Sequence, residues 1–397
     1  MKKILGIVAG AALAVAAPAQ ATNGMRMIGF GPTQNAMGGA AVAAPLDGAT
    51  IVSNPAGLSS LAPRVDLAGQ GFAPTVKYDA SWSMGGPPAA ASQSSDRPMD
   101  VLPTLSGVYR VRDDVTLGLA ALGTAGMGVE YGQGASALYQ SRMLTSYMNF
   151  RVAPAASYRI SDALSVGVAL NAMYAQMEYE AGGQPKHSAA GSFGYGATVG
   201  VAYKPVEMVT LGASYETKSA FQDFEFTIAG QKQALNFDQP MIATLGFAVR
   251  PAEGLLLAVD GQWINWSDTN GKNSPKWSKN PGGEQDWNMN WSDQLVVKVG
   301  AEYQLPALKA LRVRAGYDYG ATPLDSARAF ENVAFPAIAE HHFTVGAGYE
   351  LGKVAVNAAF MYSPEASIKG ADPTMGILAY ESRMSQTAFE LGASYRF

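Results

Sequence analysis

Residues 295–304 have the sequence LVVKVGAEYQ, in which apolar and polar side chains alternate. The odd-numbered positions are apolar or aromatic, whereas the even-numbered positions include Lys298 and Glu302. Successive side chains of a β-strand point to opposite faces, so this stretch predicts a strand with one apolar and one charged face. The same alternation occurs in residues 311–320, 342–351 and 389–397.

Turn signals divide the chain into segments of this kind. Tight turns are expected near residues 112–114, 160–163, 204–207, 251–254, 306–309 and 351–353. Longer polar connections are expected near residues 84–98, 133–143, 182–191, 228–236, 268–290, 321–340 and 366–383. The six short and seven long connections join fourteen strands. Short turns on one side and long loops on the other are typical of outer-membrane barrels.

The apolar face of the strands has two interpretations. In a soluble β-protein it would form the core, and the polar face would meet water. In a membrane barrel it faces lipid, and the polar face lines the lumen. The turn pattern favours the second interpretation, so we predict an all-β, 14-stranded antiparallel transmembrane β-barrel. Five tyrosines on the apolar face close to short turns are expected at the inner membrane interface, namely Tyr109, Tyr158, Tyr203, Tyr303 and Tyr349.

The N-terminus predicts export from the cytoplasm. Lys2 and Lys3 precede the apolar residues 4–17, and Ala19-Gln20-Ala21 forms an A-x-A cleavage site, so residues 1–21 are expected to be a signal peptide. The remaining chain has 26 basic and 32 acidic residues and no cysteine, which gives no support for nucleic-acid binding, disulfides or thiolate metal sites. No later stretch reaches the roughly 18–20 apolar residues of a membrane helix.

The segment between the signal peptide and the first strand has an unusual composition. Residues 23–58 contain seven glycines and three prolines but only two charged residues, Arg26 and Asp47. The segment is too apolar for a solvated tail and too interrupted for a long helix or strand, so we expect other parts of the chain to enclose it. Asn54 is the expected N-cap of a short helix that begins with Pro55 and Ala56.

The motifs of this segment carry a family resemblance. They are the G-x-G of Gly29 and Gly31, the paired Gly38 and Gly39 in AMGGA, and the sequence NPAGL from Asn54 onward. Together they resemble the hatch of FadL/TodX-type outer-membrane transporters of hydrophobic compounds. The resemblance extends over essentially the whole mature chain. It implies a hatch at residues 22–62 inside a barrel formed by residues 63–397.

The third predicted strand is rich in glycine. Residues 123–132 read GTAGMGVEYG, and Gly123, Gly126 and Gly128 weaken strand pairing there, so a bend or bulge is expected. By the resemblance, a kink at this place opens the barrel wall beside the hatch and lets ligand leave sideways. The alternative is a glycine-rich strand that simply packs closely on the hatch.

Five tryptophans surround the fifth long loop. Trp263, Trp266 and Trp291 lie near strand ends and are expected in an outer interfacial girdle. Trp277 and Trp287 lie farther from the strands and are expected to form an apolar patch that captures ligand.

Basic residues also fall on the polar face of the strands. Arg151, Lys298 and Arg314 are candidates for binding the headgroup of a ligand, as is the neighbouring Arg312. The alternative is that these side chains pair with carboxylates on the same faces, such as Glu302 and Asp318.

Sequence motifs of enzymes are lacking. The chain has no G-x-S-x-G elbow, no H-E-x-x-H and no phosphate-binding glycine loop, while His341 and His342 are adjacent and should point to opposite faces of a strand. We therefore predict no catalytic residue, no metal site and no cofactor. An outer-membrane lipid hydrolase and a nonspecific porin remain alternatives, although a hatch argues against the porin.

The sequence and the resemblance together predict a multi-pass barrel in the outer membrane of a Gram-negative cell. It would take up long-chain fatty acids or hydrocarbons by passive diffusion. The expected partners are the hydrophobic ligand, outer-membrane lipid and lipopolysaccharide, with no nucleic acid, and the barrel is expected to be a monomer. The terminal aromatic residue Phe397 resembles the signal read by the barrel assembly machinery.

Overall fold

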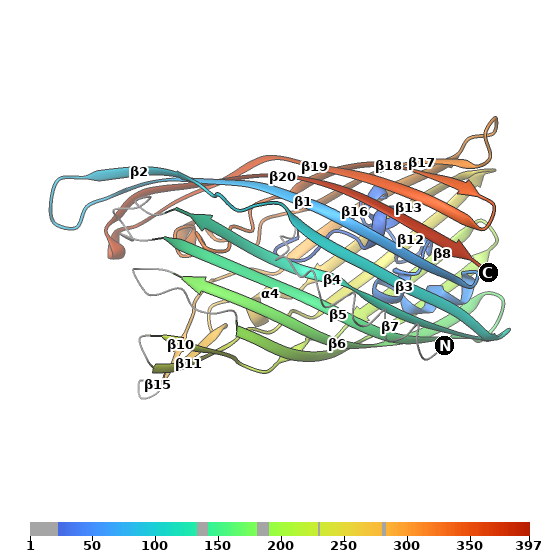
Figure 1. The fold of residues 1–397 in the computed structure, drawn as a ribbon, viewed down its shortest axis with the longest axis horizontal. Coiled ribbons are helices and arrows are strands. Elements are labelled where there is room, and N and C mark those ends of the chain that lie inside the picture. The colour runs from blue at the N-terminus through green and yellow to red at the C-terminus, as the bar shows by residue number, and fades with distance from the viewer. Residues whose placement is uncertain (1–22, 133–141, 181–189, 229–230, 280–282) are drawn as a thin grey trace.

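The computed structural model describes residues 23–132, 142–180, 190–228, 231–279 and 283–397, so the predicted signal peptide lies outside the described residues. Within these ranges, fourteen antiparallel strands form a closed barrel (Figure 1). In chain order they are β1 (Arg64–Trp82), β3 (Asp100–Arg112), β4 (Val115–Tyr131), β5 (Met143–Arg159), β6 (Leu164–Glu180), β7 (Ala190–Val206), β8 (Val209–Glu216), β12 (Ile242–Ala252), β13 (Leu255–Ile264), β16 (Gln294–Gln304), β17 (Leu311–Gly320), β18 (His341–Leu351), β19 (Val354–Asp372) and β20 (Ile377–Arg396).

The first strand closes the barrel by pairing on both of its edges. Arg64 of β1 lies opposite Arg396 of β20 on one side and Val108 of β3 on the other. Neighbouring strands in the sequence are also neighbours around the ring, so the topology is a meander. The predicted C-terminal strand therefore supplies the closing edge.

The two faces of the strands are those that the alternation predicts. In β16, Leu295 is 71% exposed, whereas Lys298 on the other face is 4% exposed. All five tyrosines expected near the short turns are exposed on the outer face. The exterior is thus apolar and the lumen carries the charges, which is the reverse of a soluble β-protein.

The two ends of the barrel differ as expected. The six short connections and the start of β1 lie at the end where β20 finishes, and the longer connections lie at the opposite end (Figure 1). The long loop expected at residues 366–383 is wrong. β19 continues to residue 372 and β20 begins at residue 377, so only four residues join them. These four residues include the short helix η3 (Pro373–Met375), which ends at Gly376 in the left-handed conformation.

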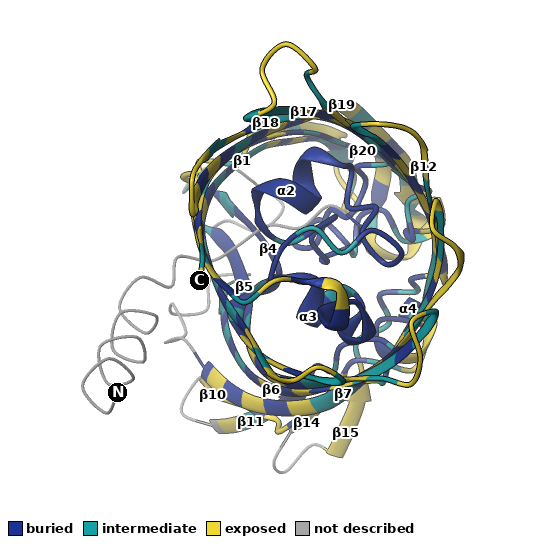
Figure 2. Ribbon diagram, turned by 90° about the vertical axis from the view of Figure 1, so that its right-hand side faces the viewer, coloured by how far each residue is buried: buried dark blue, intermediate teal, exposed yellow. Residues whose placement is uncertain are grey.

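Residues 23–62 fill part of the lumen. They form α2 (Gly31–Ala36), α3 (Thr50–Ser53) and the 3-10 helix η1 (Pro55–Ser60), which lie inside the ring of strands in Figure 2. The Asn54 side chain accepts a hydrogen bond from the Ala56 N–H, and Pro55 follows the cap as predicted. Nearly all residues of this segment are buried.

Smaller elements lie at the long-loop end. β2 (Ala89–Ser94) extends β1 as a hairpin, and β9 (Ala220–Phe221) pairs with β7. A second sheet contains β10 (Phe224–Ile228), β11 (Gln231–Asn236), β14 (Lys276–Lys279) and β15 (Gly283–Asp286). The remaining helices are α4 (Trp266–Thr269) and η2 (Ser326–Arg328). In the described ranges, no helix has the length and apolar character needed to cross a membrane.

The arrangement of the ends can be tested by labelling intact cells. Because the chain has no cysteine, single cysteines at Ser278 and Ala327 of the long loops should react with an impermeant thiol reagent without background. A cysteine at Asp113, in the turn between β3 and β4, should react only after the membrane is permeabilised. Labelling of Asp113→Cys alone on intact cells would contradict the orientation.

Candidate functional site

Close approach of backbones seats the hatch against the barrel wall. Gly38 and Gly39 both have positive φ angles, of 63° and 78°. A Cβ atom at Gly38 would lie 2.6 Å from the Tyr317 N of the wall, and one at Gly39 would lie 1.9 Å from the Ile28 O within the hatch. Only glycine meets both demands at these positions. The barrel wall has glycines at positions that face inward and contact the hatch. They are Gly167, Gly200, Gly212, Gly300, Gly316 and Gly346.

Polar side chains of the barrel form hydrogen bonds with N–H and carbonyl groups of the hatch backbone. Asp260 Oδ2 accepts hydrogen bonds from the N–H groups of Ala41 (2.8 Å) and Val42 (3.0 Å). Lys298 Nζ donates to the Ile28 carbonyl at 2.7 Å. A buried N–H or carbonyl group without such a partner would cost free energy comparable to a lost hydrogen bond. These side chains therefore hold the irregular backbone of the hatch inside the lumen.

A buried ion triad is the strongest polar link between the hatch and the wall. Arg26 of the hatch donates to both oxygens of Glu216 on β8, each at 3.0 Å. Arg151 of β5 also contacts both oxygens, one of them at 3.1 Å. Arg151 is fully buried, and Glu216 is 5% exposed. One carboxylate is thus shared by two bidentate guanidinium groups from different elements, and the triad keeps one net positive charge.

A second anchor lies at the start of the described chain. Asn23 Nδ2 donates to Asp318 Oδ2 at 3.0 Å, and His342 Nδ1 lies 2.7 Å from the other oxygen of Asp318. All three side chains are buried, while His341 is exposed on the opposite face as predicted. Farther along the hatch, Asn35 donates to Glu390 on β20 at 2.6 Å.

Within the hatch itself, Asp47 is buried. Its Oδ1 accepts hydrogen bonds from the Gln34 side chain at 3.2 Å and from the Ala49 N–H at 3.1 Å. Burial, together with the nearby Asp66 carboxylate, raises the pKa of Asp47 to about 6. At neutral pH the group is therefore an anion that depends on these two donors and on nearby arginines.

The basic residues predicted to meet a ligand headgroup are engaged with the protein. Arg151 binds Glu216, Lys298 binds the hatch, and Arg314 donates to Glu302 at 2.7 Å. The alternative of pairing within the lumen is the one that the structure supports. A ligand could use these cations only by displacing their present acceptors.

The glycine-rich part of β4 loses one of its neighbours. Pairing between β3 and β4 ends at Thr104 opposite Leu122, although β4 continues for nine more residues to Tyr131. The ladder between β4 and β5 continues to Met143 but shifts register between Gly123 and Ala125. The bulge expected in this stretch is therefore present, and beyond it β4 has an edge with which β3 does not pair.

The bulge also changes which side chains face inward. Below it, the odd-numbered Leu117 and Leu119 are exposed on the outer face. Thr124 is the extra residue, so above the bulge Met127 and Val129 are buried in the interior and the even-numbered positions face outward. Gly126 and Gly128 thus place no side chain on the outer side of this edge.

The hatch occupies the edge that β3 leaves. Arg26 forms an isolated antiparallel bridge with Ala125. The Met27 N–H donates to the Thr124 carbonyl at 3.3 Å, and the Gly126 N–H donates to the Met25 carbonyl at 2.9 Å. Residues 25–27 therefore substitute for a wall strand at the gap.

Above the hatch, the lumen is apolar rather than polar. One cluster of buried residues extends from Met25 and Met27 of the hatch to the long loops. Its aromatic members include Tyr147 and Phe237, whose ring centroids are 5.1 Å apart. The cluster contains nine methionines, which are Met25, Met27, Met127, Met143, Met173, Met177, Met289, Met361 and Met384. We call this region the apolar chamber.

The loop of residues 321–340 folds into the apolar chamber, so its expected polar character is wrong. Phe330, Val333, Phe335 and Ile338 are all buried there. The Phe335 ring lies 5.8 Å from that of Phe237. The apolar run in residues 333–339, VAFPAIA, was a signal of this burial in the sequence.

The tryptophans fall into two groups that differ from the predicted girdle. Trp266 and Trp291 are buried, with ring centroids 5.1 Å apart, because Gln294 and Asn332 accept hydrogen bonds from their indole N–H groups. The girdle prediction is wrong for these two, whereas Trp263 lies on the outer face. Trp277 and Trp287 are half-buried, and the Trp287 ring lies 5.4 Å from Phe335 at the rim of the chamber.

The described part of the chain contains no candidate metal site. No group of three or more histidine, cysteine, aspartate or glutamate side chains there is placed to hold a metal ion. The site is instead defined by an apolar chamber, a docked hatch and the edge of β4 with which β3 does not pair.

A closed, even-stranded antiparallel barrel with an apolar exterior and a hatch in its lumen defines an outer-membrane β-barrel. The family model described as outer membrane protein transport protein (OMPP1/FadL/TodX) matches residues 7–397. The chain therefore belongs to this family and resides in the outer membrane. No protein with a curated description matches it.

Solved structures agree on the fold. A Pseudomonas aeruginosa FadL homologue superimposes with a TM-score of 0.79 at 16% identity, covering 94% of this chain and 100% of its own. The P. putida toluene transporter TodX gives 0.77 at 20% identity, with 93% and 99% covered. The Ralstonia pickettii toluene transporter TbuX gives 0.71 at 19% identity, again with 93% and 99% covered. At these identities the likeness concerns the fold.

The ion triad predicts an asymmetry between its members. In Glu216→Gln, two buried guanidinium groups lose their shared counter-charge, so we expect a loss of about 3–5 kcal/mol and earlier release of the hatch. In Arg26→Gln the neutral Arg151–Glu216 pair remains, so the loss should be smaller. Thermal unfolding in detergent and limited proteolysis of the hatch measure both effects. Equal stability of Glu216→Gln and the parent would contradict the role of the triad.

Proposed function

We propose that this protein takes up hydrophobic small molecules across the outer membrane by passive diffusion. A ligand enters among the long loops, occupies the apolar chamber, and leaves sideways through the wall between β3 and β4. The physical need is that an apolar solute crosses the sugar-rich outer surface poorly, so an apolar path favours its entry. The function is transport and not catalysis.

The chamber supports the proposal through its chemistry. Methionine side chains are flexible and polarizable, and they make favourable contacts with aromatic rings, so a methionine-rich apolar cluster can repack around apolar ligands of different shape. The loop of residues 329–339 and its Phe335 occupy this space in the structure, so a ligand must move them to enter. Trp277 and Trp287 lie at the rim, where they offer the first apolar contact.

The observation that carries the exit route is the strand edge at Gly123. β3 stops pairing with β4 there, and the bulge turns apolar side chains toward the chamber. Gly126 and Gly128 add no side chain to this edge, and the Arg97 side chain lies against Gly128. Residues 25–27 of the hatch occupy one part of this edge through backbone hydrogen bonds, and farther along it the Asp96 N–H donates to the Glu130 carbonyl at 2.8 Å. We infer that these residues detach from β4 to let the ligand pass into the bilayer. The membrane lipid then receives the ligand.

Two structural relatives point to one ligand class. TodX and TbuX are described as toluene transporters, and both share this fold. Long-chain fatty acids are the other class to which the family resemblance points. The cations closest to the chamber already bind carboxylates or backbone, which favours neutral hydrocarbons for this chain.

A reversible covalent lock tests the exit route. Arg26 and Ala125 form a non-hydrogen-bonded antiparallel pair, for which a Cα separation of about 4.5 Å is usual and suits a disulfide. In Arg26→Cys/Ala125→Cys, oxidation should pin the hatch to β4 and reduce the uptake of a hydrophobic tracer to the background of cells lacking the protein. Reduction of the disulfide should restore uptake.

The single variant Arg26→Cys is the matched control, because it loses the same arginine but cannot form the lock. Its uptake should be unaffected by oxidant. If the oxidised double variant carries the tracer at its reduced rate, ligand does not leave between the hatch and β4.

A further inference from the structure

A second cavity lies at the opposite end of the lumen, beneath the hatch. Its volume is about 410 Å³. Residues Pro45, Leu46 and Leu61 of the hatch form its roof, and the turn at Gly254 and the end of β20 lie at its mouth. This end carries the short turns and so faces the periplasm. The cavity is separate from the apolar chamber and has no part in the proposed transport route.

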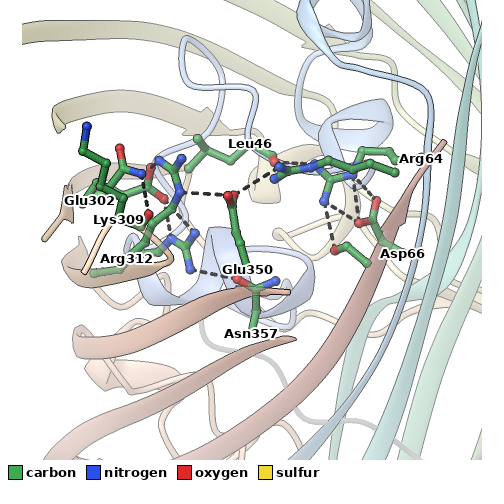
Figure 3. Close-up of polar contacts among 12 residues, drawn as sticks. Leu46, Arg64, Asp66, Glu302, Lys309, Arg312, Glu350 and Asn357 are labelled. Atoms are coloured by element: carbon green, nitrogen blue, oxygen red, sulfur yellow. Dashed lines mark hydrogen bonds and ion pairs between the residues drawn. The ribbon is translucent and has the colours of Figure 1, made fainter. Parts of the chain in front are cut away.

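The walls of this cavity carry an excess of positive charge. Five arginines but only two glutamates line it, namely Arg64, Arg250, Arg312, Arg314 and Arg396 with Glu302 and Glu350. Figure 3 shows the central part of this network. Because one sign of charge prevails inside a concave, partly buried surface, the cavity attracts anions.

Two of the arginines are fully used by the protein. Arg64 binds Asp66 and donates to the Leu46 carbonyl of the hatch at 2.9 Å and to Ser394 Oγ at 3.0 Å. Arg314 binds Glu302 and Asn357, the latter at 3.0 Å. These two side chains are buried, and their positions in the wall of the cavity are fixed by these contacts.

The other three arginines keep unused donors. Arg312 contacts Glu302 at 3.2 Å through Nη1 and Glu350 at 3.4 Å through Nε, while Arg396 contacts Glu350 at 3.1 Å through Nη1 alone. Arg250 forms no ion pair or side-chain hydrogen bond with any described residue, although it lines the same cavity. Arg312, Arg314 and Arg396 share two glutamates, so with Arg250 the lining has an excess of two positive charges, one of which is offset by the buried Asp47 carboxylate near Arg64 and Arg314.

We propose that this cavity is a binding site for a soluble periplasmic anion that carries at least two phosphate or carboxylate groups. The planar guanidinium fork matches both groups. An anionic ligand balances the excess of positive charge. The open donors come from β12, β17 and β20, which lie on different parts of the ring, so more than one anionic group is needed to reach them. Because the hatch forms the roof, the bound anion also steadies the hatch.

The mature protein in phosphatidylcholine nanodiscs provides the test, with pyrophosphate as the probe in isothermal titration calorimetry. We expect saturable binding of one pyrophosphate per barrel, and binding of the single carboxylate acetate at least tenfold weaker. Arg250→Gln and Arg396→Gln should each weaken pyrophosphate binding by about tenfold or more, because each removes one charge-assisted contact. Thermal unfolding should shift upward with pyrophosphate in the parent.

Arg112→Gln is the matched control. Arg112 lies at the same end of the barrel, in an exposed pair with Asp114 at 2.6 Å, and does not line the cavity. This variant should bind pyrophosphate as the parent does. Absence of saturable binding to the parent would overturn the proposal, and so would an equal loss in Arg112→Gln.

A change of the nanodisc lipid tests whether the site binds a soluble anion or a lipid headgroup. The cavity opens into the lumen rather than onto the outer face, so replacing phosphatidylcholine with phosphatidylglycerol should leave pyrophosphate affinity unchanged. A loss of affinity in phosphatidylglycerol would assign the site to a lipid headgroup and overturn the proposal of a soluble anion. Uptake of the hydrophobic tracer is independent of these results, because these variants alter no residue of the apolar chamber or of the contact between residues 25–27 and β4.

Discussion

The structure depends on satisfying an irregular backbone inside a barrel. Residues 23–62 have too many glycines and prolines to pair their own N–H and carbonyl groups in one regular element, yet they lie buried in the lumen. The wall solves this with inward-facing glycines, which let the two backbones touch, and with side chains such as Asp260 and Lys298, which complete the hydrogen bonds. The plug and the wall are consequently one packed unit.

This docking divides the lumen into two environments. Toward the periplasm, charged side chains hold the hatch and line the basic cavity. Toward the outside, the lumen is apolar, and the loop containing Phe335 folds into it. The gap beside β4 lies at the boundary, where Met25 and Met27 of the hatch meet the chamber. A ligand in the chamber is thus next to the one part of the described wall where the hatch replaces a strand.

Local pattern was enough to predict the barrel but not its contacts. Period-two alternation in residues 295–304 predicted the strand and the character of both its faces, because successive side chains of a strand point to opposite faces. The glycines at 123, 126 and 128 gave the bulge for a similar local reason. Glu216 was missed because its partner Arg26 lies 190 residues away, and no local signal links them. Trp266 and Trp291 were misplaced because Trp266 begins the short helix α4 and Trp291 precedes β16, so strand alternation decides the direction of neither side chain.

Photolabelling is the measurement that tests the central claim most directly, which is that ligand passes from the apolar chamber to the wall beside β4. A diazirine-bearing hydrocarbon would be activated in the outer membrane, and the modified peptides identified by mass spectrometry. The account predicts labels in residues 25–27 and 124–131 and on chamber residues such as Met177. Labels confined to the periplasmic lumen, around Glu302 and Arg314, would contradict it.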